Sequence, residues 1–209
     1  MPPFQALLLY IYALFPGPAM FDTLLLHIRK FVSLSEAEEQ LITSALQYRA
    51  VKKKGYLLEE GQRCTANYFI AKGCCRMYFI TEAGTEQIVQ FGIDNWWITD
   101  YLSFDSGKAS GFYIQAVESS EVLQMDKSVQ EELLRRVPQL ERYFRVILQR
   151  AFGAAQMRIQ YIYGMSAEER YRHFNKLFPE FVQRVPQYML ASYLGFTPEF
   201  LSKVRAKRS

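Results

Sequence analysis

The stretch from residue 49 to residue 125 constrains the fold most, because short runs of β-branched and aromatic residues alternate in it with single glycines. These runs include NYFIAKG, RMYFITEAG and EQIVQFG. Short strands broken by turn residues at this rhythm predict a β-sandwich or β-barrel. We expect the glycines to adopt positive φ in tight turns, where other residues would be strained. They are Gly55, Gly61, Gly73, Gly84 and Gly92.

Helical patterns flank this β-rich region on both sides. Before it, Ser33 or Ser35 can cap the segment SEAEEQLITSAL, whose first turn carries acidic residues that a helix dipole favours. After it, Asp126 or Ser128 can cap the segment SVQEELLRRV. The chain therefore predicts a β domain with helices at both ends.

A longer helix is expected from Gln139 to Tyr163. Its apolar residues recur in steps of three and four and form one stripe about six turns long. They are Leu140, Phe144, Ile147, Ala151, Ala155, Ile159 and Ile162. Such a helix belongs either to the core of the protein or to the seam of a two-fold dimer, and its length favours the dimer. Gly164 then breaks the helix and is a candidate hinge.

The C-terminal segment has the layout of a helix, a glycine turn and a second helix. Pro186 can start the first helix, and Gly195 stands where a sharp turn is needed. Thr197 can cap the last helix, with Pro198 at its first position. This is the layout of a helix-turn-helix, although a plain helical hairpin used for packing would share it. Small or apolar residues can fill the joint between the helices: Leu190, Ala191, Leu194, Leu201 and Val204.

The last helix predicts contact with double-stranded DNA. The net charge is +4, and from residue 182 to residue 209 basic residues outnumber Glu199, the single acidic residue there. A helix fits the major groove, where we expect Lys203 to bond a guanine and Glu199 to accept a hydrogen bond from a cytosine amino group. Lys207 and Arg208 are expected to touch phosphate. The whole predicted set is Thr197, Glu199, Phe200, Ser202, Lys203, Arg205, Lys207 and Arg208. The alternative is a solubilising basic tail.

The sequence also resembles a known family. ASYLGFTPEFLSKVR resembles the DNA-reading motif of the Crp/Fnr regulators, and KGYLLEEGQ…NYFIAKGCCRMYFITEAGTE resembles their cyclic-nucleotide-binding-type β-roll. The resemblance covers residues 21 to 209 and implies an α+β fold. Its parts would be a β-roll of the double-stranded β-helix or jelly-roll type with flanking helices, a dimerisation helix and an all-α helix-turn-helix domain. We place the β-roll effector domain at residues 20–138, the dimerisation helix at 139–163 and the DNA-binding domain at 164–209.

The resemblance further implies a transcription regulator that binds a two-fold symmetric site as a homodimer, with half-sites about one helical turn apart. RNA polymerase would be a further partner. The DNA motif departs from the family at two positions. Family members often carry arginine where this chain has Pro198, and again where it has Lys203. A different base preference from that of the best-known members is therefore expected.

The ligand-binding cassette departs more strongly. In members that bind cyclic nucleotides, a Gly-Glu pair holds the ribose and an arginine pairs with the cyclic phosphate. In this chain the segment from Trp97 to Asp100 stands over the Gly-Glu end, and Ser110 stands in place of the arginine. Ser110 cannot neutralise a phosphate, and Lys108 lacks the bidentate fork, so cyclic AMP is not expected to bind in the usual manner. The candidate pocket residues are Trp97, Thr99, Asp100, Lys108, Ser110 and Gly111.

Cysteine and histidine usage argues against metal or iron–sulfur chemistry. The three cysteines are Cys64, Cys74 and Cys75, too few for a four-thiolate cluster, and none lies in residues 1–63. An odd number with an adjacent pair is a poor disulfide framework, so a reducing cytoplasm is expected. The two histidines, His27 and His173, lie far apart. No metal or cofactor is predicted, apart from a small-molecule effector of unknown identity.

Residues 1–19 form a distinct apolar arm, FQALLLYIYALF between proline-rich flanks. It is too short for a membrane span and lacks the basic start of a secretory signal, so no membrane partner is expected. One interpretation is a misassigned start, with Met20 as the biological start. The other is a genuine arm that docks on a partner or on the effector domain.

Three functional hypotheses follow. The first is a dimeric DNA-binding regulator gated by a small ligand in the roll, and the second is the same regulator with a degenerate, unresponsive pocket. The third is a cupin-like β-barrel enzyme with a helical tail. That enzyme would need a histidine-rich metal site, but residues 49–125 contain no histidine. We therefore expect a regulator and not an enzyme.

Overall fold

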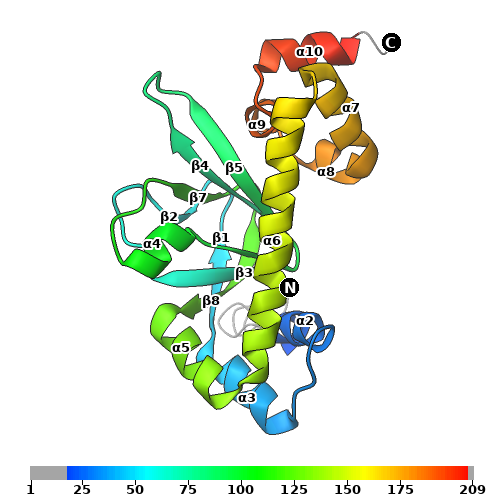
Figure 1. Ribbon diagram of the computed structural model, residues 1–209. Coiled ribbons are helices and arrows are strands. Elements are labelled where there is room, and N and C mark those ends of the chain that lie inside the picture. The colour runs from blue at the N-terminus through cyan, green and yellow to red at the C-terminus, as the bar shows by residue number, and fades with distance from the viewer. Residues whose placement is uncertain (1–17, 207–209) are drawn as a thin grey trace, which may run out of the picture.

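The computed structural model describes residues 18–206, and two antiparallel four-stranded sheets in it form a β-roll (Figure 1). One sheet has the strand order β1-β8-β3-β6, and the other has the order β2-β7-β4-β5. The strands are β1 (Gln47–Val51), β2 (Tyr56–Leu58), β3 (Ala66–Lys72), β4 (Cys74–Ile80), β5 (Glu86–Ile93), β6 (Trp96–Ile98), β7 (Tyr113–Ala116) and β8 (Ser120–Asp126). The predicted β-roll is therefore confirmed.

Helices lie at both ends of the roll and beyond it. They are α2 (Pro18–Arg29), α3 (Glu36–Ala45), α4 (Tyr101–Ser106), α5 (Lys127–Arg136), α6 (Gln139–Gly164), α7 (Ala167–Leu177), α8 (Pro179–Arg184), α9 (Gln187–Leu194) and α10 (Pro198–Ala206). The long helix α6 runs past the roll, and α7 to α10 gather around its far end (Figure 1). Among the described helices, none is both long and apolar enough to cross a membrane. The apolar arm lies almost wholly outside the described residues.

The space between the two sheets is filled by side chains of the roll itself. Tyr68 and Ile70 of β3 pack there with Cys75 of β4 and Ile114 of β7, and all four are buried. The Tyr68 hydroxyl donates a 3.0 Å hydrogen bond to the Leu57 carbonyl. Its polar atom is thus satisfied inside an apolar core, as buried polar atoms generally are.

The outer face of the β1-β8-β3-β6 sheet is covered by α2 and by the first half of α6. Phe69 lies 5.3 Å from Trp97 between ring centroids. The Trp97 Nε1–H donates a 2.8 Å hydrogen bond to the Tyr143 hydroxyl, which also lies 2.8 Å from Nδ1 of His27. Burial raises the pKa of Tyr143 and lowers that of His27, so both remain neutral at neutral pH. This network joins α2, the sheet and α6.

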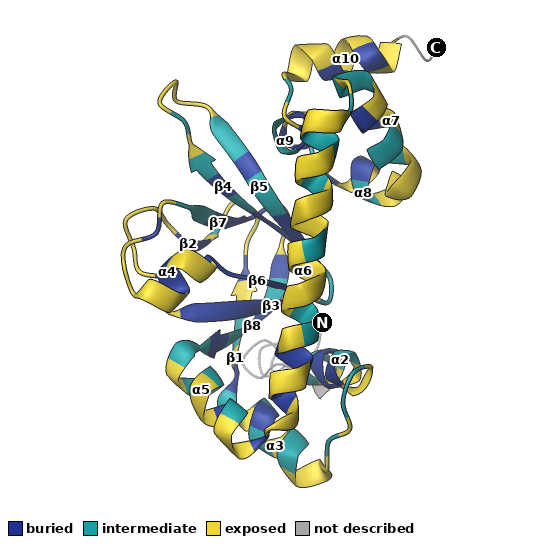
Figure 2. Cartoon of the chain, in the orientation of Figure 1, coloured by how far each residue is buried: buried dark blue, intermediate teal, exposed yellow. Residues whose placement is uncertain are grey.

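The apolar stripe of α6 divides into two halves. Leu140 and Phe144 are buried against the roll, whereas Ile159 is 56% exposed and Phe152, which borders the stripe beside Ala151, is 66% exposed (Figure 2). Ile147 is partly buried at the boundary. One stripe therefore serves as core in its first half and as an uncovered apolar surface in its second half.

The glycine prediction holds only in part. Positive φ occurs at Gly61, Gly73 and Gly84, as predicted. The prediction is wrong for Gly55 and Gly92, where the backbone does not take positive φ. A Cβ on Gly92 would lie 2.6 Å from Cδ1 of Ile70, so close packing excludes a side chain there instead.

The C-terminal helices dock on the outer face and edge of the second sheet. Ser192 of α9 lies against the edge strand β5, where its hydroxyl accepts a 2.9 Å hydrogen bond from the Ile88 amide and donates a 2.8 Å bond to the Glu86 carbonyl. Arg158 of α6 donates to the Tyr193 carbonyl at 2.9 Å and to the Ile88 carbonyl at 3.1 Å. These bonds fix the orientation of α9 relative to the roll.

Candidate nucleic-acid interface

Gly195 makes the turn between α9 and α10. Its φ is +77°, a conformation that residues with a side chain rarely adopt. The Phe196 amide donates a 3.1 Å hydrogen bond to the Ala191 carbonyl, which closes the end of α9. Ala191 itself is fully buried in the joint, with the apolar residues predicted to fill it: Leu190, Leu194, Leu201 and Val204. The predicted helix, glycine turn and helix are confirmed.

Thr197 caps the start of α10, as predicted. Its hydroxyl oxygen accepts a 3.3 Å hydrogen bond from the Phe200 amide, and its carbonyl accepts the Leu201 amide at 3.1 Å. Residues of a helix are about 100° apart. Because Leu201 and Val204 are buried, the opposite face presents Glu199, Ser202 and Lys203, and all three are exposed.

The outward face of α10 carries both signs of charge. Hydrogen bonds to its own amide and to Thr197 lower the pKa of Glu199, and the positive charge of Lys203 lowers it further. Glu199 is therefore ionised at neutral pH and can only accept hydrogen bonds. Phe200 borders this face, 36% exposed, with its ring 5.5 Å from that of Phe196.

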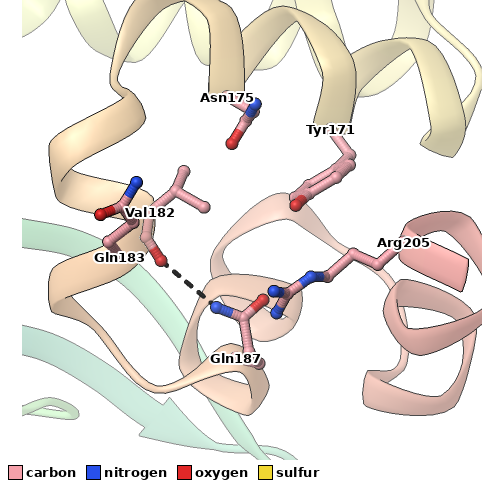
Figure 3. Close-up of a pocket in the computed structure, with 6 residues that line it drawn as sticks. All are labelled: Tyr171, Asn175, Val182, Gln183, Gln187 and Arg205. Carbon is pink, nitrogen blue, oxygen red and sulfur yellow. Dashed lines mark hydrogen bonds between the residues drawn. The ribbon is translucent and has the colours of Figure 1, made fainter. Parts of the chain in front are cut away.

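Two basic residues near the C-terminus, Arg205 and Arg184, do not lie on the outward face of α10. The Arg205 side chain lines a cavity between α10 and helices α7 to α9 (Figure 3). Arg184 forms ion pairs with Asp94 at 2.5 Å and with Glu118 at 2.6 Å. Arg184, one of the basic residues between residues 182 and 209, is therefore held by acidic residues of the roll. Lys207 and Arg208 lie outside the described residues.

Sequence reasoning missed the residues that join the C-terminal helices to the roll. Arg158 carried a signal, because a charged residue at stripe spacing between Ala155 and Ile162 interrupts an apolar face. No sequence signal marked Ser192 or Arg184, because their hydrogen-bond partners lie 66 to 106 residues away in the chain.

Two of the predicted pocket residues, Asp100 and Ser110, form a buried hydrogen-bond network. One carboxylate oxygen of Asp100 accepts the amides of Leu102 at 3.0 Å and Ser103 at 3.3 Å at the start of α4. The other oxygen accepts the Ser110 hydroxyl at 2.6 Å. Asp100 and Ser110 are 3% and 4% exposed. The two residues therefore lie together as predicted, but their hydrogen bonds stabilise the start of α4 and the loop that follows it.

The other predicted pocket residues are scattered around this network. Trp97 faces the outer core and contacts Tyr143, so its assignment to the pocket is wrong; the sheet separates the two faces. Thr99 donates to the Ala66 carbonyl at 2.9 Å. The Lys108 and Gly111 positions are exposed in the loop after α4.

The cysteines are buried and free. Burial raises the pKa of the Cys74 and Cys75 thiols to about 12. Both are therefore protonated at neutral pH and poor metal ligands. Within residues 18–206, no three histidine, cysteine or acidic residues gather in a way that could hold a metal ion.

Sequence comparison finds one matching domain family and several similar regulatory proteins. Residues 48–137 match the cyclic nucleotide-binding domain family. The chain is similar to the fumarate and nitrate reduction regulatory protein of Vibrio cholerae, with 26% identity over 186 residues, which cover 82% of this chain and 73% of that protein.

Solved structures share the fold. FixK2 from Bradyrhizobium japonicum superposes with a TM-score of 0.65 at 17% identity, covering 78% of this chain and 83% of that one. A transcriptional regulator of the Crp/Fnr family from Eubacterium rectale superposes with a TM-score of 0.64 at 16% identity, covering 83% of each chain. The chain thus contains a cyclic nucleotide-binding-type roll followed by a long helix and a glycine-turned helix pair, and it is similar to transcription regulators of the Crp/Fnr type.

Proposed function

We propose that this regulator reads a specific DNA sequence with the outward face of α10. The observation that carries the proposal is the exposure of Glu199, Ser202 and Lys203 on a helix whose opposite face is buried by Leu201 and Val204. Lys203 suits guanine, whose major-groove edge offers two acceptors, and the ionised Glu199 suits the amino group of cytosine. Phe200 at the border can meet a thymine methyl group.

Phosphate contacts would hold the helix in its groove without specifying sequence. We assign this role to the Thr197 hydroxyl and to the basic residues Lys207 and Arg208. Arg205 is left out of the DNA-reading set, because its side chain turns toward α7 and α9.

The second half of α6 is proposed as the seam of a homodimer. Phe152, Ile159 and Leu148, which is 41% exposed, form an apolar stripe with Ala151 and Ala155. Exposed stripes of this kind are unusual on monomers and suit a second copy of the same helix. A two-fold dimer would place two α10 helices on half-sites about one helical turn apart. Residues 139–163 would then be the dimerisation helix between the effector domain at 20–138 and the DNA-binding domain at 164–209.

We propose that the roll does not bind a cyclic nucleotide in the usual place. The Ser110 hydroxyl is hydrogen-bonded to the Asp100 carboxylate, and side chains fill the interior of the roll. This favours the hypothesis of a degenerate pocket over a ligand bound in the usual place. We also propose a cytoplasmic location and contact with RNA polymerase, and both rest only on the similarity to Crp/Fnr-type regulators.

Selection from a randomised duplex pool with the full chain tests the proposal. We expect an enriched sequence with two-fold symmetry and half-sites about ten base pairs apart. Enrichment of a sequence without two-fold symmetry would contradict the proposed dimer. If no sequence is enriched, α10 does not read a specific sequence.

A further inference from the structure

A cavity of about 470 Å³ that is open to solvent lies between α10 and helices α7 to α9. Side chains from four helices line it: Tyr171 and Asn175 of α7, Val182 and Gln183 of α8, Gln187 of α9 and Arg205 of α10 (Figure 3). The volume lies within the range of small-molecule sites, about 300 to 1,000 Å³. The cavity is separate from the outward face of α10.

The polar groups that line this cavity have few partners in the protein. Gln187 donates a 3.2 Å hydrogen bond from Nε2 to the Val182 carbonyl, while its Oε1 is buried without a partner. Within the described residues, the side chains of Tyr171, Asn175 and Arg205 form no hydrogen bond or ion pair. Among the described lining residues, the Gln187 oxygen is the buried polar atom without a partner, whereas Arg205 is exposed, so its guanidinium is free to pair with a ligand that enters the cavity.

The charge of the lining residues favours an anionic ligand. Arg205 is cationic, and none of the described lining residues carries a carboxylate. The guanidinium fork matches carboxylate and phosphate groups with two parallel hydrogen bonds. The Tyr171 hydroxyl and the amide groups of Asn175 and Gln183 can donate further hydrogen bonds to the same ligand.

We propose that this cavity binds a small organic or inorganic anion whose carboxylate or phosphate group pairs with Arg205. The bound anion joins the last turn of α10 to α7, α8 and α9. Because α10 is otherwise anchored by Leu201 and Val204, the anion stabilises the helix that carries the outward face. The site needs no DNA, and so it stands or falls separately from the proposed function.

Calorimetric titration of the full chain tests the site with two probes, inorganic phosphate and glutarate, each at constant ionic strength. Saturable binding of phosphate identifies a phosphoryl ligand, and saturable binding of glutarate identifies a carboxylate ligand. Hydrogen exchange of the α10 amides is expected to slow on addition of the probe that binds.

Three variants connect the binding to the cavity. Arg205→Gln is expected to weaken binding about ten-fold or more, since it removes a charge-assisted bidentate contact. Gln187→Glu is expected to abolish binding, because it places a negative charge beside Arg205 with little change of volume. Arg172→Gln is the matched control, since Arg172 lies on the exposed side of α7 with a side chain 61% exposed, paired with Glu168.

Saturable binding that is lost in Arg205→Gln and kept in Arg172→Gln supports the site. Failure of both probes to bind saturably overturns it. Equal weakening by Arg205→Gln and Arg172→Gln also overturns it, because the attraction would then come from the general charge of the domain.

Discussion

The Ser110 hydroxyl donates a 2.6 Å hydrogen bond to the Asp100 carboxylate, at the position where the resemblance to cyclic-nucleotide-binding domains implies a phosphate-binding arginine. The second carboxylate oxygen is held by the amides that begin α4. Both oxygens of Asp100 are therefore occupied by the protein, and the neighbourhood offers no buried cation to a cyclic phosphate among the described pocket residues.

Cyclic AMP and cyclic GMP are accordingly expected to leave thermal unfolding unchanged at millimolar concentration. A ligand at about 100 times its dissociation constant would add about 2.7 kcal/mol, which a melting curve detects easily. An upward shift with either nucleotide would mean that Asp100 is released to the ligand, and it would restore the ligand-gated hypothesis.

Lys203→Ala is expected to weaken binding to the selected duplex by about 1–3 kcal/mol, with a smaller effect on a scrambled duplex. The reason is that Lys203 faces outward from α10 and is assigned to a base edge. Arg208→Ala is the comparison, because loss of a phosphate contact lowers both affinities similarly and reduces the salt dependence. If the two variants behave alike in titrations at several salt concentrations, Lys203 does not read a base.

Phe152→Glu is expected to convert the proposed dimer to a monomer. Phe152 is 66% exposed in the single chain, so the charge has little effect on the fold of the protomer but would be buried in the seam. Gln160→Glu is the matched control, since it adds the same charge at an exposed position of α6 away from the stripe. Sedimentation equilibrium measures both. A dimeric Phe152→Glu variant would place the interface elsewhere.

The ion pairs of Arg184 are expected to make domain docking sensitive to acid. Burial opposes ionisation of Asp94, but the hydrogen bonds from Arg184 and the Gly73 amide outweigh it and lower the pKa of Asp94. The folded pKa then lies below the unfolded value of about 3.9, so the stabilisation is complete above that value and is lost as the pH falls through the folded pKa.

Urea unfolding of Asp94→Asn and wild type at pH 7 and near pH 3 checks this dependence. The difference in unfolding free energy between them should shrink at the lower pH. In an Arg184→Ala background the difference should be small at both values. A difference that is equally large at both pH values in the wild-type background would show that Asp94 contributes by packing alone.

Local rules explain why much of the DNA-facing motif could be predicted. Gly195 and Thr197 act within a few residues of their own positions, and the turn and the cap depend on backbone geometry that the residue type largely fixes. The apolar joint around Ala191 follows from helical spacing in the same way.

Relationships across the fold could not be predicted in this way. Alternation along β6 shows that Trp97 lies on one face of a strand, but not whether that face looks into the roll or toward α6. By sequence alone, Arg184 is one of the basic residues near the C-terminus. In the fold it pairs with Asp94 and Glu118, which are 90 and 66 residues away in the chain. Arg205 likewise looked like a DNA contact, and only the packing of α7 to α9 shows the cavity that it lines.

The most direct test of the account is the ratio of affinities of the full chain for its selected duplex and for a scrambled duplex of equal length, measured by fluorescence anisotropy at one salt concentration. Sequence reading by α10 predicts a ratio of about 10³ or more. A ratio near one would contradict the account, because binding would then rest on phosphate contacts alone.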